Sequence, residues 1–230
     1  MPNHSRWLVA NWKLQGCKDD LHALYQHVQA YQGVDFQAHW IITPPMVYVA
    51  HAVSLFKDFS HIHVAAPTVS HYAQGPWTGR VSASMLADIG CTHVLLGHQE
   101  RLWERDDLFE RLQQAHGKNL RTIICWGDDR TQALVSMLKD CPQDHVLLAY
   151  EPSRSIGQGG QAAPLASVEN FVQSLRSQGV RCPVLYGGSV SGDNIQSFWH
   201  CGHLQGVLLG RASFDYPLQI QAVTKNFAKE

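Results

Sequence analysis

The chain has 230 residues, 45% of them hydrophobic, which is enough to bury a large core and fits a single barrel-sized domain. Lys and Arg number 18 and Asp and Glu number 19, so the formal net charge is −1. This balance gives no overall field that would attract nucleic acid or an anionic membrane. We therefore expect no nucleic acid and no membrane among the partners, and any anion site must be local.

The cysteines and the apolar runs indicate a cellular compartment. The six cysteines include no CxxC pair, and Cys125 lies inside an apolar run, which is typical of reduced thiols rather than a disulfide framework. The apolar stretch near the amino terminus is too short for a signal peptide, and no apolar run is long enough to cross a bilayer. We expect a cytoplasmic protein.

Eight short apolar runs recur along the chain. Each is continuous rather than alternating, which predicts strands buried on both faces of a parallel sheet; the runs are 6–10, 39–43, 62–66, 92–97, 121–125, 145–150, 183–187 and 206–210. Helical periodicity lies between them, at 19–31, 131–140 and 167–179, the last ending with Gly179. We predict one α/β domain over residues 1–230, a (β/α)8 barrel. An open Rossmann-type sheet is the alternative, but no GxGxxG follows the first strand.

Polar residues follow several of these predicted strands. Because barrel active sites lie at the carboxyl ends of the strands, these positions are the candidates for chemistry. They are Asn11, Trp12 and Lys13 after the first strand, His98 to Arg101 after the fourth, Glu151 after the sixth, "GGS" (187–189) after the seventh, and Gly210 and Arg211 after the eighth.

Five motifs carry a resemblance to a known family. In chain order they are "ANWK", "LLGHQER", "AYEPSRSIGQGG", "LYGGSV" and "GVLLGRAS". Their order and spacing resemble those of the triosephosphate isomerases, from residue 7 to about residue 215. Each motif alone is a weak signal, but five in register, each after a predicted strand, are specific.

The resemblance implies an aldose–ketose isomerase that interconverts glyceraldehyde 3-phosphate and dihydroxyacetone phosphate in glycolysis and gluconeogenesis, without metal or organic cofactor. This reaction needs a base, an electrophile for the enediolate and a grip on phosphate. Glu151 is the expected base, and His98 the electrophile. His98 should be neutral, as in the family's own pattern, with a helix amino terminus beside it. Lys13 would supply positive charge and Asn11 a hydrogen-bond donor, with Glu100 orienting Lys13.

The phosphate grip is expected in glycine-rich turns. Backbone N–H groups of such turns bind anions, and barrels commonly bind phosphate after strands seven and eight. We assign Gly157, Ser189, Gly210 and Arg211 to substrate binding, chiefly through their main-chain N–H groups. Residues 152–160 resemble the family's mobile lid, which would shield the enediolate phosphate from water.

Several positions depart from the family pattern. Gln99 stands where serine is expected, and Arg211 where glycine is common. In the lid, Arg154 replaces a tryptophan. Outside the lid, in "CWGD" after the fifth predicted strand, Asp128 stands where glutamate is usual. We expect Asp128 to pair with Arg154 and to hold the lid open.

The loop at 74–82 resembles the family's third loop, which enters the neighbouring subunit. The resemblance therefore implies a homodimer through residues 74–82. Arg80 occupies a position where an acid is common, and Trp77 would be an unusual exposed residue for a monomer.

Other functions remain open. The altered lid and Arg211 leave room for a sister isomerase acting on a tetrose phosphate, and the phosphate grip alone would serve a non-catalytic binding barrel. Lys13 as a Schiff-base nucleophile would indicate an aldolase-type barrel, but no second lysine follows a later strand. The histidines of "HIH" (61–63) and "HCGH" (200–203) do not form a converging ligand set, so we expect no metal.

Overall fold

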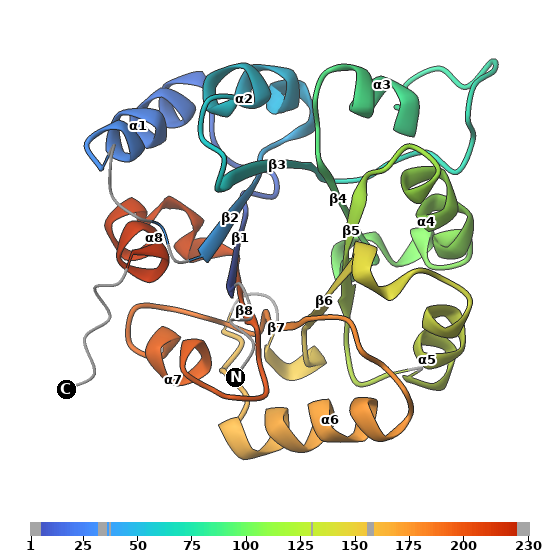
Figure 1. The fold of residues 1–230 in the computed structure, drawn as a ribbon, viewed down its shortest axis with the longest axis vertical. Helices are drawn as coiled ribbons and strands as arrows, with labels where there is room; N and C mark the ends of the chain where they lie inside the picture. Colours follow the sequence, from blue (N-terminus) through green and yellow to red (C-terminus); the bar gives the residue numbers. More distant parts are fainter. Residues whose placement is uncertain (1–5, 32–35, 37, 130, 156–158, 225–230) are drawn as a thin grey trace.

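The computed structural model describes residues 6–31, 36, 38–129, 131–155 and 159–224. Eight parallel strands form a closed barrel in chain order (Figure 1). They are β1 (Arg6–Asn11), β2 (Ala38–Thr43), β3 (Ile62–Ala66), β4 (His93–Leu96), β5 (Arg121–Trp126), β6 (Val146–Tyr150), β7 (Val184–Tyr186) and β8 (Gly206–Leu209). The predicted (β/α)8 barrel is confirmed, and each strand overlaps one of the predicted apolar runs.

Helices surround the barrel (Figure 1). They are α1 (Lys18–Gln29), α2 (Val49–Phe56), α3 (Ala83–Asp88), α4 (Leu108–His116), α5 (Thr131–Lys139), α6 (Leu165–Ser177), α7 (Ile195–Trp199) and α8 (Tyr216–Val223). Short 3-10 helices interrupt the connections: η1 (Met46–Tyr48), η2 (Gln99–Glu104), η3 (Gln143–His145), η4 (Ser153–Ser155) and η5 (Arg211–Phe214). In the described part of the chain, none of the helices combines the length and apolar character required to cross a membrane.

The strands are continuous in hydrophobicity because they are covered on both sides. One buried cluster fills the barrel interior with residues such as Val9, Ile41 and Ile123, while their sequence neighbours face the helices. Leu8 and Ile42, for example, belong to the larger cluster between sheet and helices. Side chains alternate between the two faces of a strand, so two apolar environments require an unbroken apolar run.

Helix α6 illustrates how the outer layer is specified. Its buried residues Val168, Val172 and Leu175 recur at three- and four-residue spacing, which places them on one face toward the sheet. The helix ends before Gly179, which has φ +92°, a conformation that glycine adopts without steric penalty. The predicted helix end at Gly179 is confirmed.

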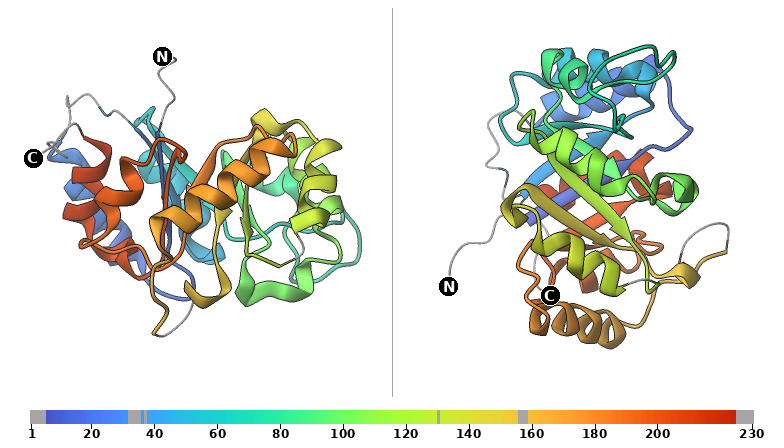
Figure 2. Two further views of the ribbon diagram at one scale, coloured as in Figure 1. Left: turned by 90° about the horizontal axis from the view of Figure 1, so that it is seen from below. Right: turned by 90° about the vertical axis from the view of Figure 1, so that its right-hand side faces the viewer.

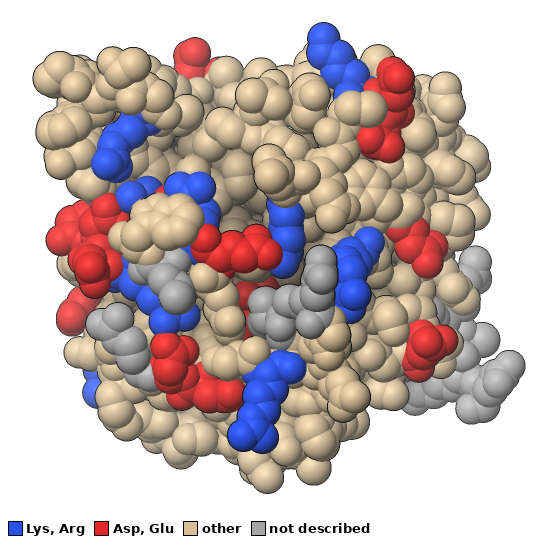
Figure 3. All heavy atoms as spheres, turned by 180° about the vertical axis from the view of Figure 1, so that it is seen from behind, with Lys and Arg blue, Asp and Glu red and all other residues tan. Residues whose placement is uncertain are grey.

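All eight strands run in the same direction, so their carboxyl ends share one face of the barrel. The side views of Figure 2 show the strands crossing the molecule between its two faces. Figure 3 shows the face with the carboxyl ends, where Lys, Arg, Asp and Glu side chains gather around a central hollow. The residues that follow the strands therefore meet at this face.

Candidate active site

Glu151 directly follows β6 and is buried. Its backbone N–H donates to the Trp126 carbonyl of β5 at 2.7 Å, so the strand ladder still holds it. The side chain is 1% exposed, and neither carboxylate oxygen accepts from an N–H or O–H group of the described residues, although the Cys125 thiol lies beside it. A Cβ added at Gly187 would lie 2.9 Å from Glu151 Cγ, so only glycine leaves room for this carboxylate.

This burial changes the acidity of Glu151. Loss of water raises the pKa of its carboxyl to about 8, and the positive charge of Lys13 opposes the rise. A carboxylate with a pKa near neutrality is a stronger base than an exposed one. The group can thus accept a proton from carbon more readily than an ordinary glutamate.

His98 faces this carboxyl across a short gap. Its Nε2 lies 3.7 Å from Glu151 Oε2, and the ring is 3% exposed. The backbone N–H of Glu100 donates to Nδ1 at 3.2 Å, so Nδ1 carries no hydrogen and the neutral ring holds its hydrogen on Nε2. Burial first, and then the charge of Lys13, lower the pKa of His98 to about 4, while Glu100 opposes this. A neutral imidazole therefore points its N–H into the site.

The helix expected beside His98 is shorter and less regular than the sequence predicts. Residues Gln99–Glu104 form the 3-10 helix η2, interrupted at Arg101 with φ −131° and ψ 47°. One backbone N–H from this segment, that of Glu100, reaches the ring. The lowered pKa of His98 comes first from burial and then from the charge of Lys13.

Lys13 is held in a constrained turn after β1. Its φ is +57°, and its backbone N–H donates to Asn11 Oδ1 at 3.1 Å. Its Nζ donates to Glu100 Oε1 at 2.8 Å, which joins the ends of β1 and β4. Non-glycine residues rarely have positive φ, and such residues concentrate at functional sites. The structure thus brings Asn11, Lys13, Glu100, His98 and Glu151 together.

The predicted phosphate-binding residues lie on the two turns after β7 and β8. These strands are neighbours, with Leu185 paired to Gly206 and Tyr186 to Val207. Gly210 lies beside Lys13, since a Cβ added to it would be 3.7 Å from Lys13 Cε. Arg211 is exposed and begins η5. Gly157 lies outside the described residues.

Ser189 connects its turn to the two described ends of the predicted lid. It has φ +51°, and its hydroxyl lies 2.7 Å from the Ser155 carbonyl and 2.9 Å from the Gly160 carbonyl, either of which it can donate to. Beyond the lid, the Ala163 N–H donates to the Tyr186 hydroxyl at 2.6 Å. The turn after β7 therefore holds both ends of this segment.

The expected pair of Asp128 and Arg154 is wrong. Asp128 instead accepts a hydrogen bond from the Tyr150 hydroxyl, and no ion pair joins it to Arg154 in the described part of the chain. Tyr150 is the register partner of Trp126, so its hydroxyl reaches the residues just beyond β5. Arg154 is exposed to solvent.

Sequence reasoning noted Gln99 only as a departure and missed its contact. Its side-chain Nε2 donates to the backbone carbonyl of Glu151 at 3.0 Å. The signal was the replacement of a short hydroxyl by a longer amide donor next to His98. Gly187 was also missed as the residue that makes room for Glu151.

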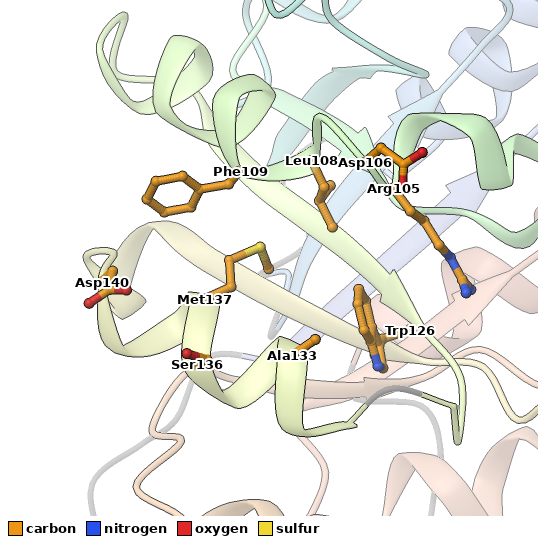
Figure 4. A pocket seen from close by; sticks show the side chains of 9 residues that line it. All are labelled: Arg105, Asp106, Leu108, Phe109, Trp126, Ala133, Ser136, Met137 and Asp140. Carbon is orange, nitrogen blue, oxygen red and sulfur yellow. The ribbon is translucent and has the colours of Figure 1, made fainter.

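A separate hollow of about 400 Å³ lies on the outside of the barrel between α4 and α5 (Figure 4). None of the candidate site residues lines it; its lining is Arg105, Asp106, Leu108, Phe109, Trp126, Ala133, Ser136, Met137 and Asp140. In the described residues, no three or more His, Cys, Asp or Glu side chains are placed to hold a metal ion. The Glu151–His98 pair lies elsewhere, at the carboxyl ends of the strands.

A closed (β/α)8 barrel whose polar side chains meet at the carboxyl ends of its strands has the architecture of the barrel enzymes. The sequence model of the family described as "Triosephosphate isomerase" matches residues 6–225. The chain therefore belongs to the triosephosphate isomerase family.

Individual relatives agree with this family. The triosephosphate isomerase of Nitrosococcus oceani is 32% identical, over 90% of this chain and 93% of its own length. That of Nitrosomonas europaea is 30% identical, over 90% of this chain and 92% of its own. That of Wolbachia pipientis is 29% identical, over 96% and 95%. The similarity thus spans nearly whole proteins on both sides.

Proposed function

We propose that the chain is a triosephosphate isomerase that interconverts D-glyceraldehyde 3-phosphate and dihydroxyacetone phosphate, a reaction of glycolysis and, in reverse, of gluconeogenesis. Family membership supports the reaction. The observation that carries the assignment of roles is the 3.7 Å approach of Glu151 Oε2 and His98 Nε2, both buried at the carboxyl ends of the strands. A base and a neutral N–H donor at this distance can both reach one small substrate that lies beside them.

In the proposed mechanism the Glu151 carboxylate removes the proton from the carbon next to the substrate carbonyl. The electron pair moves into an enediolate, and His98 Nε2–H donates to the oxygen that gains charge. The protonated Glu151 then returns the proton to the neighbouring carbon, while His98 passes a proton between the two oxygens. Protons and electrons balance, so no oxidant, metal or organic cofactor is needed.

Lys13 stabilises the charge that develops in this step. Its ammonium lies next to Glu100, and its charge already acts on both Glu151 and His98 in the free protein. Asn11 holds the Lys13 backbone and is 4% exposed, so it also lies at the site. The cation favours the ionised base and the enediolate, and it disfavours imidazolium.

Phosphate binding is proposed for the backbone N–H groups of Ser189, Gly210 and Arg211, together with Gly157 of the lid. The adjacency of the β7 and β8 turns and the position of Gly210 beside Lys13 support this placement. Closure of the lid would remove water from the enediolate and limit loss of phosphate.

A coupled assay tests the proposal. We expect turnover of glyceraldehyde 3-phosphate to exceed that of erythrose 4-phosphate in kcat/KM, and Glu151→Gln to lower kcat by about 10²-fold or more. A higher kcat/KM with erythrose 4-phosphate would assign the chain to the tetrose reaction. No turnover of either substrate would leave a phosphate-binding barrel.

We also propose a homodimer through residues 74–82. Trp77 is 43% exposed and stacks on Tyr72 with ring centroids 3.9 Å apart, while the Arg80 guanidinium lies 5.4 Å from the Tyr72 ring centroid. These contacts give an exposed loop a rigid aromatic tip, which suits insertion into a partner. Sedimentation that finds one 25.7 kDa species at micromolar concentration would contradict the dimer. The cytoplasmic location stays a prediction, in keeping with six cysteines that are all free thiols.

A further inference from the structure

Gln99 links the segment after β4 to the carboxyl end of β6. Its Nε2 donates to the backbone carbonyl of Glu151 at 3.0 Å. The link passes the turn after β5, where a Cβ added to Gly127 would lie 3.2 Å from the Glu151 carbonyl oxygen and 3.3 Å from Gln99 Nε2. β4 and β6 both pair with β5, so the amide spans the strand between them.

With this link, both the N–H and the C=O of Glu151 are hydrogen-bonded. The N–H of Glu151 is bound to the Trp126 carbonyl, and its C=O accepts from Gln99. The carboxylate oxygens themselves accept no hydrogen bond from an N–H or O–H group of the described residues, and the Cys125 thiol lies beside them. Backbone restraint and close packing against Gly187 therefore help to determine where the carboxylate points.

We infer that Gln99 is a positioning residue for the base: by fixing the Glu151 carbonyl, it keeps the carboxylate buried and aimed at the space beside His98 Nε2. The inference rests on the proposed function for its kinetic consequences. Without the amide, the peptide after Glu151 can rotate, and Glu151 stands at the junction between a rigid strand and the lid. A base displaced by about 1 Å can lose on the order of 10²-fold in rate.

An alternative is that Gln99 only stabilises the loop after β4. Loss of the amide would then lower stability and leave the chemistry of Glu151 unchanged. Two measurements separate these roles. The first is whether the variant changes kcat, KM or both. The second is the pKa of the Glu151 carboxyl, which depends on its burial. If Gln99 only stabilises the loop, the kinetic constants and the pKa of Glu151 should both stay as in the parent.

Gln99→Met tests the inference, because methionine keeps the length of the side chain and removes the donor. The titratable groups that face the Glu151 carboxyl all remain in this variant: His98, Lys13, Glu100 and Cys125. Gln178→Met is the matched control, since Gln178 Nε2 also donates to a backbone carbonyl, that of Ser174, at 3.2 Å on α6.

With glyceraldehyde 3-phosphate, we expect Gln99→Met to lower kcat by about 10- to 100-fold with little change in KM, and to move the acid limb of the kcat/KM profile to lower pH. Gln178→Met should match the parent in all three. Parent-like kcat and acid limb in Gln99→Met would overturn the inference. Gln99→Ala, checked by circular dichroism, serves the same purpose if the methionine variant does not fold.

A second measurement does not depend on activity. Carbon-13 NMR titration of the glutamate side chains, with Glu151 assigned by its loss in Glu151→Gln, follows the Glu151 carboxyl directly. We expect it to titrate at lower pH in Gln99→Met than in the parent, because water reaches it. An unchanged titration would overturn the inference, whereas an inactive parent with the expected shift would contradict the proposed function alone.

Discussion

The side chains of Lys13 and Glu100 are joined by a hydrogen bond of 2.8 Å between Nζ and Oε1, which connects the ends of β1 and β4 at the face of the barrel that holds Glu151. Glu100 also reaches His98, since its backbone N–H donates to Nδ1 and its Oε2 lies 3.6 Å from the same atom. One residue thus contacts both the Lys13 ammonium and the His98 ring. In the proposed mechanism its carboxylate would orient Lys13.

Glu100→Gln should lower activity with little effect on stability. The Lys13 and Glu100 side chains are 27% and 55% exposed, so their ion pair contributes about 1 kcal/mol or less to folding. The amide cannot anchor the ammonium as strongly, and a displaced Lys13 should lower kcat by up to about 10²-fold. Steady-state kinetics and thermal unfolding check this. A clear drop in the unfolding temperature that accompanies the loss of kcat would instead indicate a structural role for Glu100.

The pH dependence of kcat/KM should have an acid limb that belongs to Glu151. Burial raises the pKa of this carboxyl to about 8, and the base must be ionised to accept a proton. Activity should therefore rise with pH through neutrality, with no limb from His98 above about pH 5, because the pKa of His98 is about 4. Initial rates between pH 5 and 9 measure this, and a flat profile over that range would contradict the assignment.

Glu151→Gln should reduce the decline in folding stability that the parent shows as pH rises from about 4.5 to about 8. The pKa of Glu151 is raised from 4.5 in the unfolded chain to about 8 in the fold, so the folded state holds its proton more tightly. Its contribution is fully present below pH 4.5 and is lost as pH rises toward 8, at roughly 1.4 kcal/mol per pH unit as an upper bound. Urea unfolding of parent and variant across this range should show a smaller decline in the variant, and parallel curves would refute the burial argument.

The barrel and most of the candidate site could be predicted from sequence, because continuous apolar runs identify strands covered on both faces and the residues after them share one end. This rule placed Glu151, His98 and Lys13 among the candidates, and the family resemblance assigned their roles. The length of Gln99 and the partner of Asp128 could not be found, because both depend on which side chains meet across neighbouring strand ends. Such contacts depend on register and rotamer, which one-dimensional spacing does not contain.

Gly187→Ala should displace the base. The added methyl group would lie 2.9 Å from Glu151 Cγ, closer than real Cβ contacts allow, and 3.1 Å from Oε1, so the carboxylate must move. We expect kcat to fall by on the order of 10²-fold while the fold is kept. Gly192→Ala is the control, since a Cβ there meets nothing within 4 Å. Equal kinetics of the two variants would show that Glu151 tolerates the shift.

The amino-terminal face of the barrel carries a histidine cluster that should make the fold sensitive to acid. His39 Nδ1 and His63 Nε2 are 3.0 Å apart, Trp7 stacks on His39, and the Nε2 of the buried His93 has no hydrogen-bond partner in the described residues. Burial first, and then neighbouring histidines and Arg121, lower the pKa of His63 to about 4 and that of His93 well below its ordinary value.

Because these folded-state pKa values lie below the unfolded value of 6.5, the neutral rings stabilise the fold above pH 6.5, and this contribution is lost as pH falls toward 4. The direction is opposite to that of Glu151. His63→Gln, which cannot become charged, should unfold less steeply than the parent between pH 6.5 and 4 in urea titrations. His203→Gln, on an exposed turn, is the matched control and should follow the parent. If His63→Gln also followed the parent, protonation of His63 would not be a source of the acid sensitivity of the fold.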